Sequence, residues 1–186
     1  MKNKLLLVLI LLSSITINSQ EKLNIDITKS TIKWIGELTF HFGGHDGYIK
    51  FTEGHFIKTG DIITGGEFVI DMNSITNTDI KEQRGKDNLV KHLKDPDFFD
   101  VKKYPIAKLS ITKVEYFEDK SMRIKANFTL KGITKTIQFN ASPNYNEKSL
   151  RTKFKLDRRK WNVNYKSKLR DYAISDAIGF EVTIKL

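Results

Sequence analysis

Apolar and polar residues alternate with a period of two through most of this chain, and this pattern restricts its fold more than any other feature. In the segment 122–130 every second residue is apolar: Met122, Ile124, Ala126, Phe128 and Leu130. The same alternation recurs in the segments 107–111, 137–141, 150–156 and 178–186. Strands with one apolar and one polar face are typical of an antiparallel sheet that is wet on one side only.

The N-terminal half fits the same scheme with more turn residues. The segment 31–39 reads as a strand that carries Trp34, and 47–51 and 54–58 read as a short pair of strands joined at Thr52 and Glu53. The turn "KTGD" at 58–61 leads into a further strand. Strands joined by short turns indicate a sandwich or a barrel rather than βαβ units.

One segment breaks the alternation. Between Ile80 and Leu93, the residues Leu89, Val90 and Leu93 fall at helical spacing, and "DP" at 95–96 is a signal for the end of a helix. We therefore expect one short helical segment inserted between two blocks of strands. There is no linker, repeat or low-complexity tract, so residues 20–186 are expected to form a single domain.

A sheet with one apolar face has to bury that face. Because only one short helical segment is available to cover it, the simplest solution is to close the sheet on itself, which also removes the edge strands. The predicted fold is therefore all-β: an antiparallel closed barrel of about eight strands. A barrel of this size has a lumen that side chains can fill or that can hold one small ligand. The alternation alone leaves both possibilities open.

Residues 1–19 are predicted to be a signal peptide and not part of the fold. Lys2 and Lys4 precede an apolar run at 5–12, and small and polar residues follow at 13–20. The apolar run is well short of the roughly 20 residues that span a bilayer. We expect cleavage near Ser19 or Gln20 and a protein that is periplasmic or secreted.

Composition narrows the chemistry. The chain contains no cysteine, which excludes disulfides and thiol catalysis. The formal net charge is +10, and removal of Lys2 and Lys4 leaves 10 − 2 = +8. This surplus favours transient contact with an anionic membrane surface, or it simply keeps the surface solvated. Nucleic-acid binding is not expected, because the aromatic residues are predicted to face inward rather than to lie among the basic residues of the outer face.

Five motifs, spread over nearly the whole segment 20–186, carry a family resemblance. They are "HDGYIKFTEGHF" (45–56), "HLKDPDFFDVKKYPIA" (92–107), "LKGITKTIQF" (130–139), "LDRRKWNVNY" (156–165) and "AISDAIGFEVTIKL" (173–186). In this order they resemble the YceI family, exported lipocalin-like proteins also described as polyisoprenoid-binding. The most specific of them is the string that contains the adjacent Phe98 and Phe99.

The resemblance implies a lipocalin-like barrel with a helical segment across it and a long apolar pocket. Its ligand would be a long-chain lipid or isoprenoid: an isoprenoid quinone, a polyprenyl phosphate or a fatty-acid derivative. No resident cofactor is implied, and the chain is also a candidate homodimer. The residues that match family positions are Phe98, Phe99, His92, Arg158, Asp171 and Asp176.

Two groups of side chains are candidates for contact with such a ligand. The predicted lumen set consists of inward apolar residues: Trp34, Phe68, Ile70, Phe98, Phe99, Leu109, Ile111, Ile124, Phe128, Phe139, Phe154, Trp161 and Phe180. The predicted rim set would meet the head group: Arg84, Lys86, Lys91, His92 and Arg158. Arg158 also has a structural interpretation, as the partner of a buried carboxylate such as Asp171 or Asp176. Phe98 and Phe99 are expected to close one end of the barrel as part of a lid.

The sequence leaves three alternatives to lipid binding. An enzyme acting on a hydrophobic substrate would use His45 or His92. A zinc site formed by His41, His45 and His55 is disfavoured, because their spacing is loose and no thiolate is available; no metal is predicted. No catalytic residues are predicted either, since the chain has no nucleophile elbow or phosphate loop. A purely structural or stress-related exported barrel with a filled core is the weakest alternative.

Overall fold

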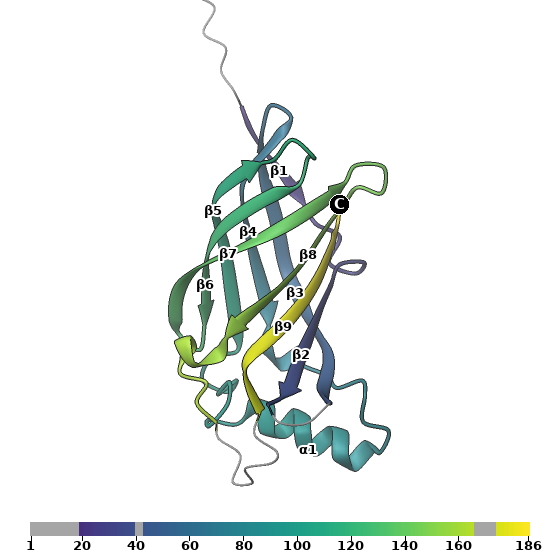
Figure 1. Cartoon of the computed structure of the whole chain (residues 1–186), viewed down its shortest axis with the longest axis vertical. Coiled ribbons are helices and arrows are strands. Elements are labelled where there is room, and N and C mark those ends of the chain that lie inside the picture. Colours follow the sequence, from purple (N-terminus) through teal and green to yellow (C-terminus); the bar gives the residue numbers. More distant parts are fainter. Residues whose placement is uncertain (1–18, 40–42, 166–173) are drawn as a thin grey trace, which may run out of the picture.

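The computed structural model describes residues 19–39, 43–165 and 174–186, and in this part of the chain the fold is an antiparallel β-barrel with one α-helix beside one end (Figure 1). The strands are β1 Gln20–Asn24, β2 Thr31–Leu38, β3 Gly44–Thr59, β4 Ile62–Asp71, β5 Ile106–Tyr116, β6 Met122–Leu130, β7 Ile133–Asn144, β8 Ser149–Asp157 and β9 Ile174–Lys185. The helices are η1 Met72–Ser74, α1 Gln83–Lys94 and η2 Arg158–Trp161. No helix in the described ranges is long and apolar enough to cross a membrane.

Strand β3 closes the barrel. Its first part pairs with β2, from Glu37↔Gly44 to Ile32↔Ile49, and its second part pairs with β4, from Lys50↔Asp71 to Thr59↔Ile62. From β2 the ladder continues through β9, β8, β7, β6 and β5 to β4, so that β2–β9 form a closed barrel of eight strands. The predicted fold class is confirmed, and α1 lies between β4 and β5 in the sequence, as expected.

Two details differ from the sequence-based expectation. The segments 47–51 and 54–58 are not a pair of strands: Thr52 and Glu53 form a bulge within the single long strand β3, where the register with β4 shifts between Phe51 and Glu53. A bulge takes up one extra residue without reversing the chain. The extra strand β1 was not anticipated; it pairs with the end of β3 from Asn24↔His55 to Gln20↔Thr59.

Strands β7 and β8 are joined by backbone hydrogen bonds over only part of their length. These strands pair only from Asn144↔Ser149 to Ala141↔Thr152, whereas the rest of β7 pairs only with β6 and the rest of β8 only with β9. Thr152 ends the ladder by donating its hydroxyl to the Asn140 carbonyl at 2.6 Å. Below this point side chains close the wall: the rings of Phe139 and Phe154 stack at 4.7 Å between centroids.

A close approach on the inner face of the barrel explains why position 47 is a glycine. Gly47 pairs with Trp34 on the neighbouring strand, and the Trp34 indole donates to the Thr76 carbonyl at 3.0 Å. A Cβ atom at Gly47 would lie 1.8 Å from that carbonyl oxygen. The segment from Ser74 to Asp79, which leads to α1, can therefore run alongside β3 only because this residue has no side chain.

Gly47→Ala should lower the free energy of unfolding by about 1–3 kcal/mol or more, because the added methyl group forces the Thr76 backbone and the Trp34 ring apart. Urea unfolding followed by fluorescence measures this. Gly65→Ala is the matched control, since its new Cβ would make only ordinary contacts of 3.4 Å and longer. Equal stability of the two variants would contradict this reading of the inner face.

Candidate functional site

The barrel encloses an apolar cavity. The volume of the cavity is about 210 Å³, and its wall is almost wholly apolar. Every strand of the closed barrel contributes to this wall, and so does the segment 89–99 from α1 and the loop after it. The alternation seen in the sequence places the apolar residues of each strand on this inner face, so the cavity follows directly from the pattern.

Most of the residues predicted for the lumen line this cavity: Trp34, Phe68, Ile70, Phe98, Phe99, Leu109, Ile111, Ile124, Phe128, Phe139, Phe154 and Phe180. Trp161 differs, because it is not among the lining residues. It is only 1% exposed, its indole donates to the Phe128 carbonyl at 3.2 Å, and its ring packs edge-on against the Phe128 ring. Trp161 therefore supports the cavity wall from behind Phe128. It does not face the lumen, because β8 ends at Asp157 and Trp161 belongs to the following helix η2.

Aromatic rings form two clusters on opposite walls of the cavity. Phe56, which is 1% exposed, and Phe68 meet edge-on at 5.1 Å, with Phe51 6.0 Å from Phe68. On the opposite wall Phe154 lies between Phe139 and Phe180, with nearly parallel rings. Both clusters contribute to the wall of the cavity, together with Leu89 and Leu93 of α1.

The segment after α1, residues 95–101, forms a lid over the α1 end of the barrel. Phe98 is 5% exposed, and its ring meets Phe99 edge-on at 4.8 Å; both rings line the cavity. A tight turn presents them inward, since the Phe98 amide donates to the Asp95 carbonyl at 3.0 Å and Asp100 has a φ of 50°. From α1, Leu89 and Leu93 join the same wall. The expected inward position of the two phenylalanines is what the structure shows.

Lys131 ties this lid to the barrel, a role that the sequence did not reveal. Its Nζ atom donates to the carbonyls of Phe98 at 2.7 Å, Pro96 at 3.0 Å and Asn162 at 3.3 Å. Lys131 can reach them because it lies with Gly132 in a tight hairpin turn in which both residues have positive φ, 50° and 73°. One ammonium group thus joins the lid, the β6–β7 turn and the end of η2.

The predicted rim residues separate into two groups. Arg84, Lys86 and Lys91 lie on α1 but do not line the cavity, whereas His92 and Arg158 do. Helical geometry explains the difference: Leu89, His92 and Leu93 share one face of α1, and that face is turned to the lumen. The long basic side chains project from the other faces.

Arg158 is engaged within the chain. It is 4% exposed, and its guanidinium donates to the carbonyls of Val163 at 2.5 Å and Ser175 at 3.1 Å and to Asp176 at 3.4 Å. Burial lowers the pKa of Arg158 below its usual value, and the charge of Asp176 opposes this shift. These contacts hold η2 to the start of β9, so the structural interpretation of Arg158 agrees with the geometry. Asp171, the other predicted partner, lies outside the described residues.

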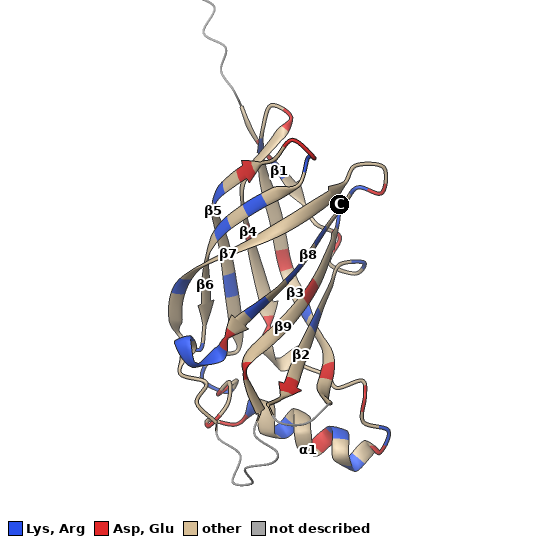
Figure 2. Cartoon of the chain, in the orientation of Figure 1, with Lys and Arg blue, Asp and Glu red and all other residues tan. Residues whose placement is uncertain are grey.

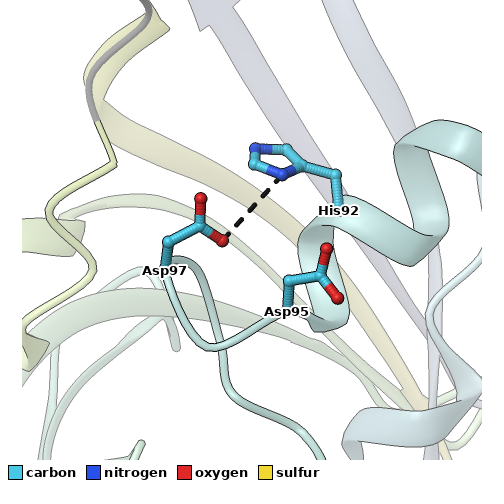
Figure 3. A group of neighbouring side chains, drawn as sticks. All are labelled: His92, Asp95 and Asp97. Carbon is cyan, nitrogen blue, oxygen red and sulfur yellow. Dashed lines mark ion pairs between the residues drawn. The ribbon is translucent and has the colours of Figure 1, made fainter.

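His92 lies beside two carboxylates at the cavity end of α1 (Figure 3). Its Nδ1 atom is 4.0 Å from Asp97 Oδ1, and Asp95 offers a third donor, with all three atoms within 4.8 Å of one another. One imidazole nitrogen and two carboxylate oxygens are donors that could hold a divalent cation. The sequence did not predict this grouping, since the candidate metal ligands there were His41, His45 and His55.

The histidines considered for zinc do not form one cluster in the described part of the chain. His45 contacts the cavity, and its Nδ1 lies 2.8 Å from Asp79 Oδ2. Burial alone would raise the pKa of Asp79, but hydrogen bonds from the Asp46 amide and from His45 hold it below its usual value. His55 lies elsewhere, in a small polar surface hollow beside Lys22 and Glu67. His41 is outside the described residues.

Comparison with known families identifies the barrel. The model of the YceI-like domain matches residues 20–186. The chain belongs to the YceI family. A UPF0312 protein from Pseudomonas putida strain F1 is 43% identical over 54 residues, and a UPF0312 protein from strain W619 is equally similar. The matching segment covers 29% of this chain and 28% of each of these relatives.

Solved structures show the same YceI-type fold at low sequence identity. BcnA of Burkholderia cenocepacia superimposes with a TM-score of 0.71 at 16% identity, over 86% of this chain and 98% of its own. A polyisoprenoid-binding domain from Saccharophagus degradans, implicated in plant cell wall breakdown, gives a TM-score of 0.56 at 14% identity, over 87% and 95% of the two chains. At such identities the likeness establishes the architecture alone.

Lys131→Met should loosen the lid of this YceI-like barrel and lower the free energy of unfolding by about 1.5–3 kcal/mol, because three carbonyl groups lose a charged donor. Hydrogen exchange followed by mass spectrometry should show faster exchange of the amides at 96–101. Lys135→Met is the control, since Lys135 is an exposed lysine further along β7. If the lid amides exchange at the same rate in both variants, Lys131 does not anchor the lid.

Proposed function

We propose that this protein binds the tail of a long-chain amphiphile in the barrel lumen and carries or sequesters it outside the cytoplasm. The apolar cavity carries the proposal. It offers about 210 Å³ of space along an apolar wall, and apolar surface left in contact with water is unfavourable by roughly 25 cal/mol per Å². An occupant that covers this wall would therefore stabilise the fold.

The wall suits a hydrocarbon better than water. A buried water needs polar partners, whereas a cavity lined by leucine, isoleucine and phenylalanine excludes it. Each methylene that moves from water into such a lumen gains about 0.8 kcal/mol. A long chain therefore binds well without any specific polar contact, and the stacked rings of Phe139, Phe154 and Phe180 offer flat surfaces along its path.

The family and the fold support a class of ligand. The domain from Saccharophagus degradans is described as polyisoprenoid-binding, and it shares this barrel. We infer an isoprenoid quinone, a polyprenyl phosphate or a fatty-acid derivative as the ligand. The rings of Phe98 and Phe99 line the lumen at the α1 end, and we infer that the ligand passes them when it enters.

Export and membrane contact are parts of the same proposal. Residues 1–19 have the pattern of a signal peptide, which would deliver the protein to the periplasm or the medium; residues 1–18 lie outside the described part of the chain. Basic residues of α1 and η2 lie at the lid end of the barrel (Figure 2), and they would favour transient contact with an anionic membrane. The homodimer stays a prediction.

Catalysis is the second candidate function, and a specific observation favours it. Two histidines contact the cavity, and each has a carboxylate beside it: Asp79 for His45 and Asp97 for His92. A histidine paired in this way is a potential general base for a hydrophobic substrate. Incubation of the protein with a bound lipid distinguishes the two functions, since a binding protein returns the lipid chemically unchanged and an enzyme converts it.

Leu109→Trp should abolish ligand binding, because Leu109 lines the cavity and a bulkier ring at this position occupies the space of the ligand tail. The measurement is the fluorescence of a long-chain conjugated polyene fatty acid titrated into delipidated protein. Lys108→Trp is the matched control, since Lys108 is the neighbour of Leu109 on β5 and is exposed on the outer face of the barrel. Equal binding by both variants would show that the lumen is not the binding site.

A further inference from the structure

One buried side-chain nitrogen in the described part of the chain has no hydrogen-bond partner, and its residue lines the cavity. It is Nε2 of His92. A buried polar group without a partner costs free energy, and native structures satisfy nearly all such groups. A histidine nitrogen that lines a binding cavity and has no protein partner therefore points to a partner supplied by the ligand.

The position of the ring fixes the direction of this nitrogen. The imidazole packs edge-on against the ring of Tyr165 at 4.4 Å and of Phe98 at 5.7 Å, and all three residues line the cavity. Figure 3 shows Nδ1 turned to Asp97 and the other ring nitrogen turned away from both carboxylates. Aromatic packing on the one side and the carboxylates on the other thus hold Nε2 at the lid end of the lumen.

The carboxylates also set the hydrogen-bonding role of Nε2. Asp97 Oδ1 is 4.0 Å from Nδ1, and Asp95 lies in the same cluster. Negative charge beside Nδ1 favours the tautomer that carries its proton there, since the other tautomer would turn a lone pair toward the carboxylates. In that tautomer Nε2 has a free lone pair and accepts a hydrogen bond.

The charged side chains that line the described part of the cavity already have partners. Glu37 is paired with Lys155 at 2.8 Å, and His45 with Asp79 at 2.8 Å. Arg158 donates to two backbone carbonyls and to Asp176. An anionic head group drawn into the lumen would meet no free cation among these lining residues, and burial of an unpaired charge is strongly unfavourable.

From these observations we propose that His92 Nε2 is the anchor for the ligand's polar end, and that this end is an uncharged hydroxyl that donates one hydrogen bond, as in a long-chain prenyl alcohol. The hydroxyl satisfies the one unpaired nitrogen, and the tail follows the apolar wall toward the far end of the barrel. The inference rests on the proposed lipid-binding function and, among isoprenoid ligands, favours the uncharged alcohol over the phosphate.

The test uses ligands with one tail and different head groups. Delipidated protein is titrated with geranylgeraniol, its methyl ether and its diphosphate, and binding is followed by calorimetry. We expect the alcohol to bind about tenfold more tightly than the ether, a difference of about 1.4 kcal/mol, because only the alcohol donates a hydrogen bond. The diphosphate should bind more weakly than the alcohol.

Two variants show whether His92 causes this preference. His92→Phe keeps an aromatic ring in the cluster with Tyr165 and Phe98 but has no acceptor, so it should bind the alcohol and the ether equally. His92→Gln has a carbonyl acceptor and should restore part of the preference. Thermal unfolding of both variants verifies that they fold.

Each contrary result has a distinct meaning. Equal affinity of the wild-type protein for alcohol and ether, or a preference that persists in His92→Phe, would overturn the assignment of His92. Tightest binding of the diphosphate would overturn the uncharged head group. If the wild-type protein binds none of the three ligands, the proposed lipid-binding function itself fails.

Discussion

The backbone pairing of β3 on both sides is the constraint on which the rest of the structure depends. Because this strand pairs with β2 along its first part and with β4 along its second, the sheet closes and all alternating apolar residues are directed into one lumen. The bulge at Thr52 and Glu53 keeps the strand continuous through its change of partner. Without closure, the apolar inner face would be exposed to water along two open edges.

Closure creates a cavity that the chain fills only in part. The rings of Phe51, Phe56 and Phe68 pack against one another, yet they and the residues of α1 line apolar space that no side chain fills. The lid then covers this space with the rings of Phe98 and Phe99, fixed by the ammonium group of Lys131. The lid thus has hydrogen bonds to Lys131 on its outer side and aromatic rings on its inner side. This arrangement suits a segment that separates a hydrocarbon from solvent. Carriage and sequestration both need such a separation.

The fold could be predicted from the sequence because period-two alternation reports directly on which side of a strand is buried. The lumen residues followed for the same reason, since Leu109, Ile124 and Phe128 occupy inward positions of regular strands. Trp161 is not among the residues that line the cavity, because it belongs to η2, where strand alternation no longer determines which way a side chain points. The sequence does not distinguish the bulge in β3 from a turn between two strands, because "TEG" at 52–54 is compatible with both.

The polar part of the site could not be predicted, because it depends on contacts between distant segments. Lys131 donates hydrogen bonds to the carbonyls of Pro96 and Phe98 at the end of the barrel. His45 pairs with Asp79, which lies 34 residues later in the sequence. Such pairs have no local signature in a single sequence. His92 was identified from its motif, but its unpaired nitrogen is visible only once Tyr165, Phe98 and Asp97 surround the ring.

The central claim is that a lipid tail occupies the lumen, and native mass spectrometry of the protein purified without detergent tests it most directly. We expect a native mass that exceeds the polypeptide mass by one long-chain lipid, and a return to the polypeptide mass on denaturation. The lipid should be recovered by organic extraction. A native mass equal to that of the polypeptide, together with an extract that contains no lipid, would contradict the account.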